Sequence, residues 1–62
     1  MDPLVKAYLD RLEEIRIQHI NHLIGGAVVD HGEYRNICGI LQGVAIATRE
    51  MKDLISQTDQ DD

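Results

Sequence analysis

The chain has 62 residues and a formal net charge of −5, with no Trp, no Phe and a single cysteine. A chain of this length forms one domain at most and buries only about 60% of its unfolded surface. One cysteine excludes an internal disulfide framework, and no metal-finger spacing is present. Association with further copies is therefore the remaining way to stabilise so small a core.

The first predicted helix covers residues 3–24. Asp2 is placed to accept the N-cap hydrogen bond, and Pro3 is tolerated at the first helical position because its missing N–H costs nothing there. Gly25-Gly26 ends the helix, since glycine accepts the left-handed conformation of a C-terminal cap. The apolar residues that follow one face at helical spacing are Val5, Tyr8, Leu9, Leu12, Ile15, Ile20 and Leu23.

The second predicted helix covers residues 31–56. Asp30 and Glu33 form a capping-box pattern, in which Asp30 accepts a hydrogen bond from a backbone N–H of the first turn and the Glu33 side chain reaches back. Val29 and Tyr34 are spaced to form the accompanying hydrophobic staple. The pattern therefore predicts a helix that starts directly after a short connector.

Together these elements predict an all-α fold, an antiparallel two-helix hairpin that oligomerises into a helical bundle. At a rise of 1.5 Å per residue the helices would be about 33 and 39 Å long. The expected layout is one helical-hairpin domain over residues 1–62, made of helix 3–24, connector 25–30, helix 31–56 and a polar, acidic tail 57–62.

A heptad line along the second helix predicts the main helix–helix interface. Its members are spaced alternately three and four residues apart, which keeps a single seam facing a partner helix, as in coiled coils. Flanking apolar residues widen the apolar arc to about 200°, more than one short partner helix can cover. The line consists of Tyr34, Ile37, Leu41, Val44, Thr48, Met51 and Ile55.

Two further groups of residues are expected at interfaces. Gly39, Gly43 and Ala47 form a ladder of small residues spaced four apart. Glycine inside a helix costs about 1 kcal/mol relative to alanine, so the two glycines indicate close approach by another helix. Ile17 and Ile24 lie off the apolar stripe of the first helix and would be exposed on an isolated hairpin, which indicates contact with another subunit.

Histidines are the only candidates for metal binding. His19 and His22 lie three residues apart, His31 follows the connector, and Cys38 would be a fourth ligand from a different helix face. We therefore expect surface or interface histidines, a buried and unreactive Cys38, no metal and no other cofactor. Catalytic residues are not expected either, because the sequence has no phosphate-binding loop and a two-helix hairpin has no interior pocket.

The acidic excess is confined to the ends of the chain. Residues 3–52 carry six basic and six acidic residues, which argues against a phosphate-binding face and against nucleic acid as a partner. The longest apolar runs are a few residues, far below the about 20 needed to span a membrane, and the N-terminus lacks the pattern of a secretion signal. The expected location is the cytoplasm, with no membrane contact.

Four short stretches of the second predicted helix form a recognisable pattern, and two of them combine glycine with apolar residues. They are Glu33-Tyr34-Arg35, Cys38-Gly39-Ile40, Gln42-Gly43-Val44-Ala45 and Asp53-Leu54. The pattern, over about 22 of 62 residues, resembles the second helix of small helical-hairpin proteins of tailed bacteriophages, which are often encoded near head and packaging genes. The resemblance implies a phage origin, a location in the infected host cell or in the virion, and a non-enzymatic role in an assembly or a host contact.

Three functions stay open at this point. The favoured one is a non-enzymatic structural or morphogenesis protein that forms a homo-oligomer through helix–helix interfaces. The second is a small regulatory adaptor that binds and occludes a host protein. The third is an RNA-binding hairpin, since ROP-like hairpins share this architecture and dimerise into four-helix bundles. The basic residues here are scattered among acidic ones, so the third function has the least support.

Overall fold

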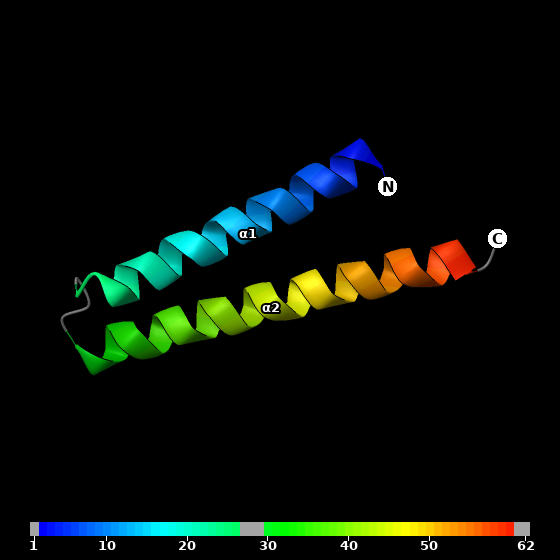
Figure 1. Ribbon diagram of the computed structural model, residues 1–62. Helices are drawn as coiled ribbons and strands as arrows, with labels where there is room; N and C mark the ends of the chain where they lie inside the picture. The colour runs from blue at the N-terminus through cyan, green and yellow to red at the C-terminus, as the bar shows by residue number, and fades with distance from the viewer. Residues whose placement is uncertain (1, 27–29, 61–62) are drawn as a thin grey trace.

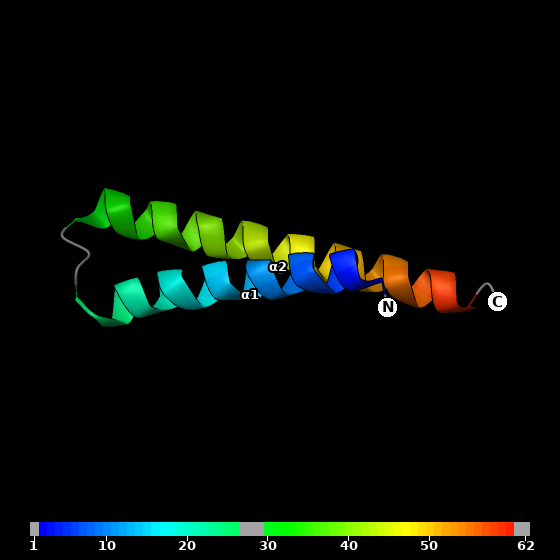
Figure 2. The ribbon, with the colours of Figure 1, turned by 90° about the horizontal axis from the view of Figure 1, so that it is seen from above.

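The computed structural model of the chain describes residues 2–26 and 30–60. Within these ranges it contains two α-helices, α1 at Pro3–Ile24 and α2 at His31–Gln60. The helices run antiparallel and side by side, with the end of α1 and the start of α2 at one end of the molecule and the start of α1 and the end of α2 toward the other (Figure 1). Seen from above, the two helix axes are inclined to each other (Figure 2). The fold is the all-α helical hairpin that the sequence predicts.

Helix α1 has the predicted bounds because both of its caps form. The Asp2 Oδ1 atom accepts a hydrogen bond from the backbone N–H of Leu4 at 2.7 Å, and Pro3 occupies the first helical position. After the last turn, Gly26 has a φ of 75°, a left-handed conformation that side chains other than glycine rarely adopt. Glycine is therefore required where the chain leaves the helix.

Helix α2 starts where the capping-box pattern places it. The Asp30 Oδ1 atom accepts a hydrogen bond from the backbone N–H of Glu33 at 2.7 Å, and the Asp30 carbonyl oxygen accepts one from Tyr34 at 3.1 Å. The hydrophobic staple expected between Val29 and Tyr34 lies outside the described residues, because it involves residue 29.

The predicted end of the second helix is wrong by four residues. Helix α2 continues to Gln60 rather than ending at residue 56, so the first part of the expected tail is helical. No glycine or proline interrupts the chain between residues 56 and 60. The Thr58 side chain also stays compatible with the helix, because its Oγ1 donates a hydrogen bond to the Leu54 carbonyl oxygen one turn back at 2.9 Å.

The hairpin is elongated and its core is thin. Its dimensions are 50 × 17 × 13 Å, and its radius of gyration is 14.7 Å. A compact domain of this length would have a radius of gyration of about 10.6 Å. Among the described residues the buried hydrophobic core consists of Leu12 on α1 and Ile37 on α2, which are 8% and 5% exposed. The rest of the apolar seam stays partly open to solvent.

Candidate interaction surfaces

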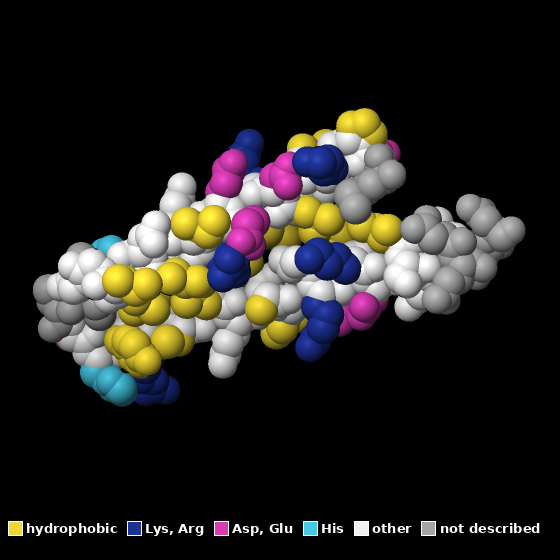
Figure 3. Space-filling view, viewed as in Figure 1, with side chains coloured by type: hydrophobic (Ala, Val, Ile, Leu, Met, Phe, Trp, Pro, Cys, Tyr) yellow, Lys and Arg dark blue, Asp and Glu magenta, His cyan; other side chains and the backbone are white. Residues whose placement is uncertain are grey.

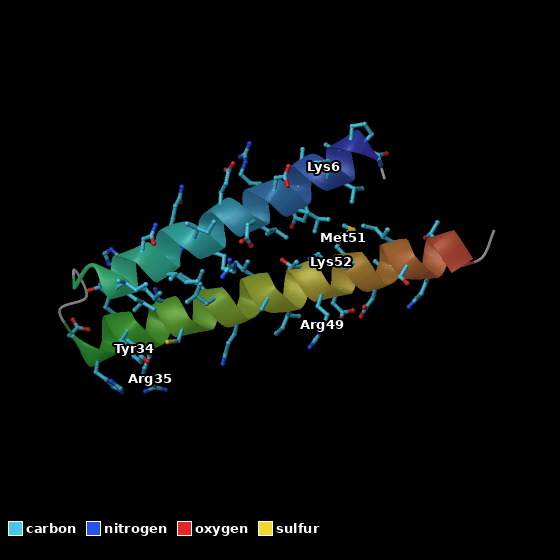
Figure 4. The ribbon with its side chains drawn as sticks, viewed as in Figure 1. Lys6, Tyr34, Arg35, Arg49, Met51 and Lys52 are labelled. Carbon is cyan, nitrogen blue, oxygen red and sulfur yellow. The ribbon has the colours of Figure 1, made fainter. Side chains whose placement is uncertain are left out.

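The predicted heptad line of α2 mainly serves the contact inside the hairpin. Ile37 is buried, and Figure 4 shows Met51 in the space between the two helices. Tyr34 is the exception, because its side chain is 49% exposed. The remaining members of the line are all partly buried, namely Leu41, Val44, Thr48, Met51 and Ile55.

The ladder of small residues does not face α1. A Cβ atom added to Gly39 or to Gly43 would meet no other atom within 4 Å. Gly43 lies about 120° around the helix from Ile37, which places it on the flank of α2 rather than in the seam, with the partly buried Ala47 at the edge. The close helix approach that the ladder predicts is therefore absent inside the hairpin.

Six residues form an apolar surface on one side of the hairpin, next to the connector. We call it the Tyr34 surface. Ile17 and Ile24 are 45% and 78% exposed, as predicted for residues off the apolar stripe. Hydrophobic side chains gather over this half of the molecule (Figure 3). The Tyr34 surface consists of Ile17, Ile20 and Ile24 from α1 and Tyr34, Cys38 and Leu41 from α2.

Helical spacing places the two parts of the Tyr34 surface on one side of the molecule. Lys6 and Ile24 are 18 residues apart, about five full turns, so they lie on the same side of α1. Tyr34 and Lys52 are related in the same way on α2. Lys6 and Lys52 line one shallow hollow between the helices, and Figure 4 shows both of them on the side that also carries Tyr34.

Charged side chains lie over the other half of the same side (Figure 3). Lys6 pairs with Asp10 at 3.0 Å, and the Arg16 Nε–H donates a hydrogen bond to the Glu13 carboxylate at 2.8 Å. The hydrogen bond from Arg16 holds the pKa of Glu13 below its ordinary 4.5. Desolvation opposes this lowering of the pKa of Glu13, and the weaker effects of the positive charges of Arg16 and Lys52 add to the lowering. These groups form a mixed, solvated cluster with both signs of charge.

Two of the three histidines make hydrogen bonds within the chain, and the His31 ring stacks on Tyr34 with ring centroids 6.3 Å apart. The His19 Nδ1–H donates to the carbonyl oxygen of Ile15 at 2.8 Å, and the His22 Nε2–H donates to the Glu33 Oε1 at 2.9 Å. In the described part of the chain, no three His, Cys, Asp or Glu side chains are placed together so that they could hold a metal ion. The hydrogen bond between His22 and Glu33 connects α1 to α2 beside the connector.

Sequence reasoning missed this contact because it assigned Glu33 to the cap of the second helix alone. The positions of the two residues in the sequence could have predicted the contact. His22 and Glu33 lie equally far from residues 27 and 28, the middle of the connector, so an antiparallel hairpin brings them to the same level.

Cys38 differs from its prediction. It is a free thiol and only partly buried, whereas the sequence predicts a buried residue. Cys38 follows Ile37 directly and is therefore rotated about 100° out of the seam, onto the Tyr34 surface.

Comparisons with family models, with curated proteins and with solved structures gave no match for the chain. Over their described residues, neither α1 nor α2 combines the length and the apolar character needed to cross a membrane. The fold and its surfaces thus define the class of protein on their own: an elongated helical hairpin with apolar residues exposed outside its seam.

Proposed function

We propose that the chain is a non-enzymatic structural protein that assembles with further copies of itself through contacts between helices. The observation that carries this proposal is the surface area. The hairpin exposes 4894 Å², whereas a compact monomer of 7.0 kDa exposes about 4050 Å². The excess of roughly 850 Å² is close to the about 800 Å² that each partner buries in a stable complex.

Large apolar side chains contribute to this excess. Burying them against another copy would remove apolar area from water, which is the dominant favourable term in protein association. The exposed large hydrophobic residues of the described chain are Leu4, Tyr8, Ile17, Ile24, Tyr34, Ile46 and Leu54.

The setting that we propose is the assembly of a phage particle in the infected cell. Its support is the resemblance of residues 33–54 to helical-hairpin proteins of tailed bacteriophages. The neighbouring genes test the setting: head, portal or terminase genes agree with it, whereas early-region genes agree with a regulatory role.

Sedimentation equilibrium on the intact chain tests self-assembly. We expect a mass of at least twice the chain mass of 7.0 kDa, with a concentration-dependent melting temperature. A mass of 7.0 kDa over the whole concentration range, together with a cooperative melt, would contradict the proposal.

A second candidate function is a regulatory adaptor that covers a site on a host protein. The observation that favours it is a separate group of apolar residues far from the connector, where Leu4, Tyr8 and Leu54 are 78%, 51% and 57% exposed. An adaptor would stay monomeric when concentrated, and its helix signal would rise when the partner is added.

The RNA-binding alternative predicts a salt-sensitive gel shift, and we expect none at physiological salt.

A further inference from the structure

We propose that a second copy of this chain packs on the Tyr34 surface, with the connectors of both hairpins at the same end of a four-helix bundle. The inference rests on the proposed self-assembly, to which it adds the contact surface and the orientation. Its starting point is the uneven distribution of charge along one side of the hairpin: the half next to the connector is mainly apolar, and most charged side chains in this view lie over the other half, among further apolar ones (Figure 3).

On this side, both helices carry charged residues toward the chain ends and apolar residues toward the connector. Residues spaced three or four apart stay on one side of a helix. The α1 line reads, from the chain end toward the connector, Lys6, Asp10, Glu13, Ile17, Ile20 and Ile24. The α2 line reads, from the connector toward the chain end, Tyr34, Cys38, Leu41, Ala45, Arg49 and Lys52. Glu13 and Lys52 line the same hollow, so the charged parts of the two lines lie at the same level.

This segregation decides the orientation of the second copy. With connectors at opposite ends, the Tyr34 surface of each copy would cover the charged half of the other, and those charges would lose water without gaining partners. With connectors at the same end, the two Tyr34 surfaces cover each other. The charged halves then meet along the wetter part of the contact.

Four of the five charged residues in the two lines are complementary in the same-end arrangement, whereas Lys6, at the level of Lys52, has its partner Asp10 within the chain. A two-fold axis along the long dimension of the hairpin places α1 of one copy on α2 of the other, so that all neighbouring helices are antiparallel. Asp10 and Glu13 of one copy then lie opposite Arg49 and Lys52 of the other. Opposite charges that face each other across a contact favour one register and orientation over the alternatives.

The hairpin as a whole has enough surface for such a contact, and Tyr34 supplies a suitable centre. It exposes roughly 850 Å² more than a compact monomer, close to the about 800 Å² that one partner of a standard complex buries. Tyrosine is enriched among the residues that dominate binding energy. Gly43 is nine residues from Tyr34, about two and a half turns, and so lies on the opposite side of α2, outside this contact.

A charge introduced at Ile17 tests the surface, and Ile46 supplies a matched control. The two isoleucines are 45% and 52% exposed. Ile46 lies nine residues from the buried Ile37, about two and a half turns, and so points away from α1. Sedimentation equilibrium on the full chain compares Ile17→Glu, Ile46→Glu and the parent, with circular dichroism to check that each variant keeps its helices. Ile17→Glu should raise the dissociation constant at least about 10-fold, and Ile46→Glu should leave it within about 2-fold.

A distance measurement tests the orientation independently. The variant His31→Cys with Cys38→Ala carries one spin label per chain, beside the connector. Because the His31 ring stacks on Tyr34 and Cys38 belongs to the Tyr34 surface, sedimentation equilibrium first checks that the labelled variant associates like the parent. Pulsed electron resonance then measures the distance between the labels of a dimer. Same-end pairing predicts less than roughly 30 Å, since neighbouring helices in a bundle lie 8–10 Å apart. Opposite-end pairing predicts more than roughly 40 Å, because the 30 residues of α2 rise 1.5 Å each.

The outcomes separate this inference from the proposed function. A parent that associates, an Ile17→Glu variant that dissociates while Ile46→Glu does not, and a short label distance support the inference. A parent that associates with both variants affected equally, with Ile17→Glu unaffected, or with a long label distance overturns the inference and leaves self-assembly intact. A parent that stays monomeric overturns both.

Discussion

His22 donates a hydrogen bond from its Nε2 to the Oε1 of Glu33 across eleven residues of sequence, and this contact joins the end of α1 to the start of α2. The side chains of His22 and Glu33 are 42% and 34% exposed. Exposed pairs of this kind contribute about 0–1 kcal/mol to stability. The contact therefore helps to set the register of the hairpin more than it stabilises the fold.

Metal removal should leave the protein unchanged. One ring nitrogen of His19 and one of His22 already make hydrogen bonds within the chain, to Ile15 and to Glu33. A zinc site would need a complete set of ligands in tetrahedral geometry. We expect the same helical content by circular dichroism and the same mass by light scattering after exhaustive chelation. Loss of either signal, restored by zinc, would show that the histidines bind a metal.

Leu12→Ala should be strongly destabilising for so small a protein. Leu12 is one of two buried core residues in the described part of the chain, and truncation of a buried leucine costs about 2–5 kcal/mol. We expect the lower end of that range, because the neighbouring seam is partly open and can relax. Urea denaturation followed by circular dichroism measures the change. Ile46→Ala is the control, since Ile46 is 52% exposed and its truncation should stay within about 0.5 kcal/mol.

Gly43→Ala and Gly43→Leu should both raise the melting temperature. Open space surrounds the position in the hairpin, so the gain in helix propensity, up to about 1 kcal/mol for alanine, is not offset by a clash. Gly39→Ala, one turn away and equally open, should behave in the same way. If leucine at position 43 lowered the mass or the melting temperature while alanine did not, another helix would cross there, as the ladder of small residues predicts from the sequence.

Acid should remove the contribution of the Glu13–Arg16 pair to stability. The pKa of Glu13 is lowered in the folded chain by its hydrogen bond to Arg16, so folding favours the ionised carboxylate. That contribution is complete above pH 4.5 and is lost as the pH falls through the lower folded pKa. The difference in melting temperature between the parent and Glu13→Gln should therefore shrink between pH 6 and pH 3. Its size should be small, because the pair is exposed.

Glu14→Gln is the matched control for this pH series. Glu14 is the next residue along the chain, is exposed, and makes no ion pair within the described part of the structure. The difference between the parent and Glu14→Gln should not change over the same pH range in the way it does for Glu13→Gln. Equal curves for both variants would assign the effect to net charge rather than to Arg16.

The sequence predicts those parts of the fold that depend on neighbouring residues. Asp2, Pro3 and Gly26 place the two ends of α1, and Asp30 places the start of α2, because each acts within one helical turn of its partner. The end of α2 is harder to place. Polar residues such as Thr58 are compatible with a helix and with a tail, so local sequence does not decide between them, and the structure shows the helix.

The interaction surfaces could be predicted only in part. The exposure of Ile17 and Ile24 follows from their place off the apolar stripe of one helix. Their alignment with Tyr34 depends on how α1 and α2 face each other. The sequence pattern of one helix alone does not show this. The same register brings Glu13 near Lys52, and local spacing does not reveal either relation.

The radius of gyration of 14.7 Å has a practical consequence for every mass measurement on this chain. A compact globular protein with that radius would contain about 150 residues. Gel filtration sorts molecules by hydrodynamic size, so a single rod-shaped hairpin would elute early and pass for a dimer. A genuine dimer that packs side by side would widen much more than it lengthens, and the two species would elute close together. Methods that weigh the particle, such as sedimentation equilibrium and native mass spectrometry, are the ones that can tell one hairpin from two.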